Sequence, residues 1–160
     1  MYKRQVLVNF LVIPIQIRIL GAEAYGLIGF MVSLQIFLAI LDLGLSKTVN
    51  REIASDTSEE RTFSRSLVQT ATAIYLAISV TISLSLIFGA DWLVSRWLKL
   101  ETIPVSEAAS AIRILAVWVV FYWPSTLYNS VLTGIQRLDI LNIVRVLTVT
   151  LVQGLSLIHI

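Results

Sequence analysis

The sequence contains no cysteine, so disulfides, thiolate nucleophiles and cysteine-ligated metal sites are excluded within its 160 residues. Charged residues are scarce as well, at 14% of the chain against roughly a quarter in a typical soluble domain. The net charge is only +2 and no nucleic-acid-binding motif is present. These shortages exclude a disulfide-stapled domain, argue against a nucleic-acid partner, and favour a membrane protein over a soluble one.

Apolar residues are abundant instead, at 57% of the chain, and the mean hydropathy is +0.85. Three long runs, 24–41, 66–90 and 114–136, carry no charged residue. A helix of about 20 apolar residues crosses the hydrocarbon core of a bilayer. We therefore predict an all-α fold, a multi-pass transmembrane helix bundle, with spans near 6–20, 27–45, 67–89, 111–133 and 141–154.

The first apolar segment allows two interpretations. Lys3 and Arg4 precede it and Ala22-Glu23-Ala24 follows it, an order that imitates a secretory signal peptide and its cleavage site. Polar and helix-breaking residues interrupt the run, however, so we favour a retained first span. With a cytoplasmic N-terminus, most of the twelve Lys and Arg residues fall on the cytoplasmic side, in agreement with the positive-inside rule.

Two polar segments separate the spans. We expect 46–65 and 91–107 to be loops, the second with Trp92 and Trp97 at the headgroup level. Gly21 and Gly26 are expected to permit a tight turn before the second span.

An enzyme would need a carboxylate pair or a set of metal ligands. The candidates, Asp56, Glu59 and Glu60, lie in one polar segment, a pattern typical of a solvated surface. We therefore expect no enzyme activity, no cofactor and no metal site.

The stretch from Arg18 to Ala54 has a distinctive order of residues. It reads LG-x-E-x-YG-L at 20–27, LDLGL at 41–45 and REIA at 51–54, and LTGIQRLDILNIVRV follows at 132–146. In combination these segments closely resemble the bacterial oligosaccharide and polysaccharide (O-antigen-type) flippases. That family belongs to the superfamily of multidrug, oligosaccharidyl-lipid and polysaccharide exporters.

The resemblance implies a transporter of the bacterial cytoplasmic membrane, built from about a dozen or more helices in two bundles. The chain would supply the first four to five helices and would pair with missing C-terminal helices of the same protein. The family flips a polyprenyl-(pyro)phosphate-linked oligosaccharide from the cytoplasmic to the outer leaflet. Two alternatives stay open: a multidrug or cation-coupled extruder of the same superfamily, and a membrane structural or interaction protein if the chain is complete at residue 160.

Such a substrate carries a phosphate, which a guanidinium binds through paired hydrogen bonds. We therefore consider Arg18, near the end of the first span, and Arg113, at the start of the fourth, as substrate-binding candidates. Both could instead snorkel to the headgroups. Gln35 is a polar residue midway along the second span and is a third candidate.

Other charged residues are candidates for structural or coupling roles. Asp42 ends the second span, ahead of Lys47 and Arg51. It is expected to cap a loop or to pair with a basic residue of another helix, while a proton- or sodium-coupling role remains open. Arg137 and Asp139 are expected to fix the loop before the last span.

The last six residues, LSLIHI, match the translation of a sequencing-library adapter. We therefore expect the native sequence of this segment to stop near Gly154, which makes 1–154 the predicted partial bundle and 155–160 a non-native tail. The sole histidine, His159, would then have no biological role.

Overall fold

A computed structural model describes residues 14, 17–19, 21–55, 61–98 and 100–159, and within these ranges all side chains except those of 61–64 and 152–159. The predicted first span, 6–20, lies largely outside the described residues, as do Asp56, Glu59 and Glu60. The side chains of the predicted 155–160 tail lie outside them too.

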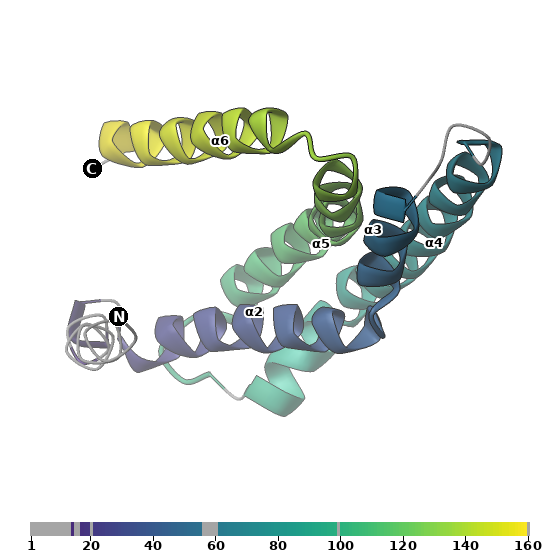
Figure 1. Ribbon diagram of the computed structural model, residues 1–160. Helices are drawn as coiled ribbons and strands as arrows, with labels where there is room; N and C mark the ends of the chain where they lie inside the picture. Colours follow the sequence, from purple (N-terminus) through teal and green to yellow (C-terminus); the bar gives the residue numbers. More distant parts are fainter. Residues whose placement is uncertain (1–13, 15–16, 20, 56–60, 99, 160) are drawn as a thin grey trace. The chain divides into compact units, whose positions relative to one another are not determined.

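The described residues are mostly helical, with short turns and loops between the helices (Figure 1). Its elements follow in the order α2 (Ala22–Leu41), α3 (Leu45–Ser55), α4 (Arg61–Trp92), the π-helix η1 (Leu93–Leu98), α5 (Val105–Gly134) and α6 (Leu138–His159). Among the described residues, three segments are long and apolar enough to cross a membrane: Ala22–Leu41, Arg65–Leu98 and Val105–Gly134. The prediction of an all-α membrane protein is confirmed.

The helix ends differ from the predicted spans. The second span was expected to run to residue 45, but α2 ends at Leu41, and Asp42–Gly44 form a turn in which Leu43 has a φ of 47° and Gly44 of 79°. Gly44 supplies this left-handed backbone without strain because it lacks a Cβ atom. The predicted spans 67–89 and 111–133 lie within α4 and α5, and 141–154 lies within α6.

Both predicted loops contain helix. The segment expected to be polar loop at 46–65 includes α3, whose Leu45, Val49 and Ile53 are four residues apart and therefore share one face. Val49 on that face is fully buried. The predicted loop 91–107 is also wrong over most of its length, because the π-helix carries the chain from α4 to Leu98 and α5 begins at Val105.

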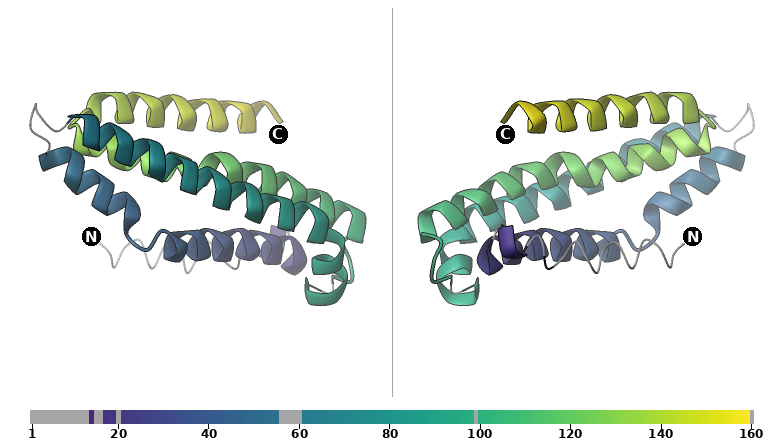
Figure 2. Two further views of the ribbon diagram at one scale, coloured as in Figure 1. Left: turned by 90° about the vertical axis from the view of Figure 1, so that its right-hand side faces the viewer. Right: turned by 90° about the vertical axis from the view of Figure 1, so that its left-hand side faces the viewer.

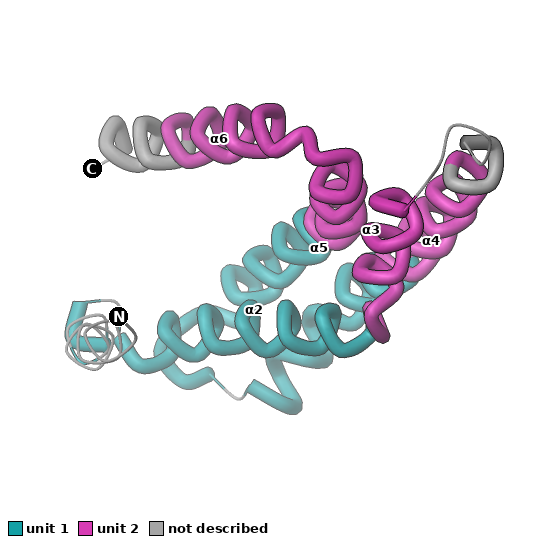
Figure 3. The backbone as a smooth tube through the Cα atoms, viewed as in Figure 1, with its two compact units in different colours: residues 1–41, 81–119 teal, residues 42–80, 120–160 magenta. Residues whose placement is uncertain are grey.

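The chain forms two compact units, residues 1–41 with 81–119 and residues 42–80 with 120–160 (Figure 3). In the first unit, Leu27 and Phe30 of α2 pack against a cluster of buried small and aliphatic residues: Ala90, Val94, Ala108, Ala109 and Ile112. Small side chains allow such helices to approach closely. Trp97 of η1 meets Phe30 edge-to-face, with ring centroids 6.1 Å apart and the planes at 71°.

The glycine turn before α2 is confirmed at one of its two predicted residues. Gly21 has a φ of 85°, in the left-handed region. Gly26, by contrast, lies inside α2. The turn places Glu23 in the first turn of α2, where its carboxylate accepts hydrogen bonds from the backbone N–H groups of residues 101–103, at 2.8–3.0 Å.

The second unit has an aromatic pair at its centre. Tyr75 of α4 and Trp123 of α5 are both almost fully buried, with ring centroids 4.6 Å apart. The α3 helix is held against α5, because the side-chain amide of Asn50 donates to the carbonyl of Ser130 at 2.8 Å. Gly134 makes this approach possible: a Cβ atom there would lie 2.9 Å from the carbonyl oxygen of Asn50.

The chain reverses direction between α5 and α6 (Figure 2). Gln136 has a φ of 59°. Its N–H donates to the carbonyl of Thr133 at 3.0 Å, and the N–H of Arg137 donates to the carbonyl of Leu132 at 2.9 Å. This pair of bonds is the Schellman arrangement that terminates helices, here with glutamine where glycine is common. It sets the start of α6 beside the end of α5.

Candidate functional site

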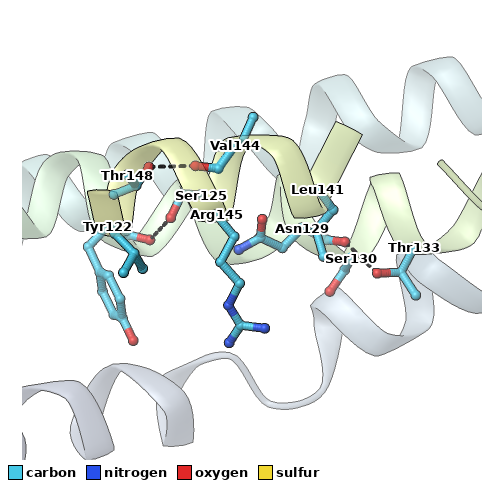
Figure 4. Close-up of a pocket in the computed structure, with 10 residues that line it drawn as sticks. Tyr122, Ser125, Asn129, Ser130, Thr133, Leu141, Val144, Arg145 and Thr148 are labelled. Atoms are coloured by element: carbon cyan, nitrogen blue, oxygen red, sulfur yellow. Dashed lines mark hydrogen bonds between the residues drawn. The ribbon is translucent and has the colours of Figure 1, made fainter. Parts of the chain in front are cut away.

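A groove of about 680 Å³ lies in the second unit, between α5 and α6 (Figure 4). From α5 it is lined by Tyr122, Ser125, Asn129, Ser130 and Thr133, and from α6 by Leu141, Val144, Arg145, Thr148 and Val149. The α5 side is therefore mainly polar, and the α6 side is mainly apolar with one cation.

The polar side follows from the spacing of the α5 residues. Ser125, Asn129 and Thr133 are four residues apart, so they project from one face of the helix. The hydroxyls of Ser125 and Thr133 donate to backbone carbonyls of their own helix, at 2.6 and 2.7 Å. Their oxygens keep acceptor capacity toward the groove, since a hydroxyl donates once and accepts through two lone pairs.

Asn129 and Arg145 differ from these hydroxyl residues. In the part of the chain that the structure describes, neither side chain has a hydrogen-bond or ion-pair partner. Of the ten described residues that line the groove, Arg145 is the one with a charged side chain. A guanidinium is planar, stays ionised and presents a fork of donors that matches a carboxylate or a phosphate. The groove thus combines a cation, an amide and an apolar wall, a set suited to an amphipathic anion.

The sequence candidate Arg113 lies elsewhere, in the first unit. Its guanidinium pairs with the carboxylate of Asp91 at 2.5 Å, and the two side chains are 41% and 63% exposed. Such an exposed pair is worth little to stability, about 1 kcal/mol or less. A contact between Arg113 and a substrate stays a prediction.

A contact of the other two candidates, Arg18 and Gln35, with a substrate also stays a prediction. Arg18 is exposed ahead of the Gly21 turn, and Gln35 is half-buried in the middle of α2. Within the described ranges, no hydrogen bond or ion pair connects any two of Arg18, Gln35 and Arg113. None of the three lines the groove.

Asp42 lies at the break between α2 and α3. The carboxylate accepts hydrogen bonds from the hydroxyl of Tyr75 and, at 2.9 Å, from that of Ser46. Its carbonyl also accepts the N–H of Leu45, at 2.7 Å, which starts α3. The carboxylate partners are hydroxyls rather than a basic residue, and Lys47 and Arg51 are exposed on α3.

Arg137, just before α6, forms an ion pair at 3.1 Å with Asp139 in the first turn of that helix. The hydrogen bond from Arg137 and, after it, the backbone N–H of Ile140 hold the pKa of Asp139 below its usual value. The carboxylate of Asp139 is therefore paired with Arg137 and bonded to the backbone of the first turn of α6.

Sequence reasoning missed Arg145 and Asn129 as site residues. The available signal was Arg145 itself, a lone charge within the predicted span 141–154, because an ionisable group inside a membrane segment marks function by default. The partner helix and the groove could not be read from the sequence. Among the described residues, no group of three or more His, Asp or Glu side chains could hold a metal ion.

Comparison with known families decides the class of protein. Residues 4–160 match the family described as polysaccharide biosynthesis protein. The chain belongs to this family. The match covers almost the whole chain and confirms the O-antigen flippase type of family that the sequence segments indicated.

One relative in the family gives a more specific name. A protein of Shigella flexneri named "Putative O-antigen transporter" is 27% identical over 143 residues, which cover 88% of this chain and 33% of that protein. The chain thus spans about a third of the length of this relative. No solved structure matches the chain significantly.

Proposed function

We propose that this chain is part of a membrane transporter that moves a polyprenyl-(pyro)phosphate-linked oligosaccharide from the cytoplasmic to the outer leaflet of the bacterial inner membrane. The observation that carries the proposal is the groove between α5 and α6 in a chain of the polysaccharide biosynthesis family. The groove places the guanidinium of Arg145, which has no partner among the described residues, beside polar and apolar walls. The name of the Shigella flexneri relative supports the same class of cargo.

The chemistry of the cargo explains why such a groove is useful. A lipid-linked glycan has an anionic phosphate, many hydroxyls and an apolar tail. Moving its charged group through hydrocarbon alone would cost several kcal/mol or more. A cation and polar side chains between membrane-spanning helices offer the head group a substitute for water, while the tail stays in lipid.

The movement itself would follow the alternating-access scheme of transporters built from helical bundles. One bundle rocks against the other around a central site, which opens first to one side of the membrane and then to the other. The chain would supply helices of one bundle. No covalent bond of the cargo changes, so the function needs no catalytic residue.

The direct test is to delete the gene that encodes this chain in its own organism and to restore it in full length. We expect the deletion to remove surface polysaccharide and to leave lipid-linked oligosaccharide in the cytoplasmic leaflet, and the gene to reverse both effects. Lipid-linked glycan extracted from cells and probed for leaflet accessibility is the measurement.

The same deletion strain also tests the alternative extruder. Unchanged surface polysaccharide, together with a new sensitivity to cationic drugs, would contradict glycan export and indicate a multidrug extruder. The membrane topology is checked separately with reporter fusions, for which we expect the turn between α5 and α6 on the cytoplasmic side.

A further inference from the structure

We infer that Arg145 and Asn129 form a binding site for the phosphate of a lipid-linked cargo, a role that deepens the proposed transport function and rests on it. Arg145 comes from α6 and Asn129 from α5, and both line the groove between these helices (Figure 4). The sequence candidates Arg18, Gln35 and Arg113 are not among the residues that line this groove.

The position of Arg145 along α6 supports this role. It lies seven residues beyond Leu138, which corresponds to about 10 Å along the helix axis. Its side chain is exposed in the described chain. Within the predicted span 141–154 the guanidinium would need an anion, water or a polar partner, because an unpaired charge in hydrocarbon is unfavourable.

The nearest acid on the same helix does not fill this need. Asp139, in the first turn of α6, is engaged by Arg137 at 3.1 Å. Among the described residues that line the groove there is no Asp or Glu. Among the described residues no acid pairs with Arg145, so an anionic ligand can supply the negative charge.

The other lining groups narrow the ligand class. The amide of Asn129 offers both donors and an acceptor, so it can bind a phosphate oxygen or a sugar hydroxyl. Leu141, Val144 and Val149 give the α6 side an apolar surface. An anion joined to an apolar chain can contact both the polar groups and the apolar surface. A free phosphate can contact only the polar groups, and a lipid alcohol mainly the apolar surface.

Binding to the purified full-length protein in nanodiscs separates these ligands. The probes are undecaprenyl phosphate, undecaprenol and inorganic phosphate, measured by thermophoresis. We expect undecaprenyl phosphate to bind at least about tenfold more tightly than either of the other two, a difference that corresponds to about 1.4 kcal/mol. Equal binding of inorganic phosphate and undecaprenyl phosphate would overturn the lipid-linked assignment.

Substitutions then locate the site. We expect Arg145→Gln to lower the affinity for undecaprenyl phosphate about tenfold or more and Arg145→Lys to lower it less, since lysine keeps the charge but loses the fork of donors. Arg65→Gln is the matched control, because Arg65 is an exposed arginine of the same unit and does not line the groove. Wild-type affinity in Arg145→Gln would overturn the inference.

Asn129→Asp distinguishes ligand binding from a structural role for Arg145. A carboxylate at this position would attract the guanidinium and repel a phosphate, so we expect weaker binding at an unchanged or raised melting temperature. Unchanged binding in Asn129→Asp would contradict the site.

Surface glycan in cells that carry Arg145→Gln separates the two proposals. Normal export and normal binding with this variant would reject the site and leave the transport function standing. Loss of the whole gene without any effect on surface glycan would reject the transport function itself.

Discussion

The backbone N–H of Thr102 bonds to both carboxylate oxygens of Glu23, at 2.9 and 3.0 Å. The N–H groups of Glu101 and Ile103 reach the same carboxylate. One side chain at the start of α2 therefore holds the segment that leads into α5. This gives a physical role to the glutamate in the LG-x-E-x-YG-L segment, because it is the acceptor that orders a short loop without regular structure of its own.

Replacing Glu23 should loosen this loop. We expect Glu23→Ala to lower the melting temperature of the purified protein and to speed proteolytic cleavage near residues 101–103, because three backbone donors lose their acceptor. Glu23→Gln should have a smaller effect, since the amide keeps one oxygen. Glu101→Gln is the control, because it changes an exposed acid of the same loop and keeps the backbone N–H. Equal melting temperatures for Glu23→Ala and the control would rule this role out.

Tyr75→Phe should destabilise the second unit by about 1–3 kcal/mol, because it removes a buried hydroxyl that donates to Asp42 and leaves the ring against Trp123. The measurement is unfolding in detergent or in a mixed micelle. Tyr128→Phe is a suitable control: its hydroxyl is 3.4 Å from that of Thr72 and its side chain is exposed. A Tyr75→Phe protein as stable as the control would show that the bond to Asp42 contributes nothing.

Gly134→Ala should separate α3 from α5. The added Cβ atom would lie 2.9 Å from the carbonyl oxygen of Asn50 and 3.1 Å from the side chain of Ile53, so the helices must shift. We expect a loss of about 1–3 kcal/mol of stability and weaker protection of α3 in hydrogen exchange.

Gly89→Ala is the matched control for this substitution. Gly89 lies in α4, where an added Cβ atom meets no described atom within 4 Å. Alanine should stabilise the helix there by about 0.5–1 kcal/mol. Similar effects of the two substitutions would show that the contact between α3 and α5 is not tight.

Arg113 and Asp91 allow a test of the first sequence candidate. If the pair is only a surface contact, a double-mutant cycle with Arg113→Gln and Asp91→Asn should give a coupling below about 1 kcal/mol, and both single variants should export glycan equally. If Arg113 contacts the cargo, Arg113→Gln should reduce export while Asp91→Asn does not. Surface polysaccharide and membrane abundance, measured together, separate these outcomes.

The helices were largely predictable from the sequence because long chargeless runs have few alternatives to a membrane helix. The polar segments were not. The charged residues of α3 suggested a loop, although Leu45, Val49 and Ile53 form an apolar stripe. That stripe indicates a helix only once its packing near Gly134 of α5 is known. The extension of α4 was missed because the charged residues around Trp97 looked like a loop, although Trp97 has a packing partner in Phe30.

The candidate site was harder to predict for a different reason. Arg113 was conspicuous at the start of its span, but the structure gives it a local partner in Asp91. Arg145 lies in the predicted span 141–154, where the sequence alone indicated no partner for it. Its proposed role in binding depends on Asn129 of α5, which lines the same groove. Residues that meet only through tertiary packing cannot be paired from spacing along one chain.

The π-helix at Leu93–Leu98 has a consequence for comparing this chain with longer or shorter relatives. A π-turn holds one more residue than an α-turn, and each residue of an α-helix advances the chain by about 100°. Deleting one residue between Leu93 and Arg96 would convert the π-turn into an α-turn, so the helix beyond it would keep nearly the same orientation and Trp97 would still face Phe30. Where an alignment shows a single-residue gap between Leu93 and Arg96, it therefore marks the loss of the π-turn rather than a shorter loop.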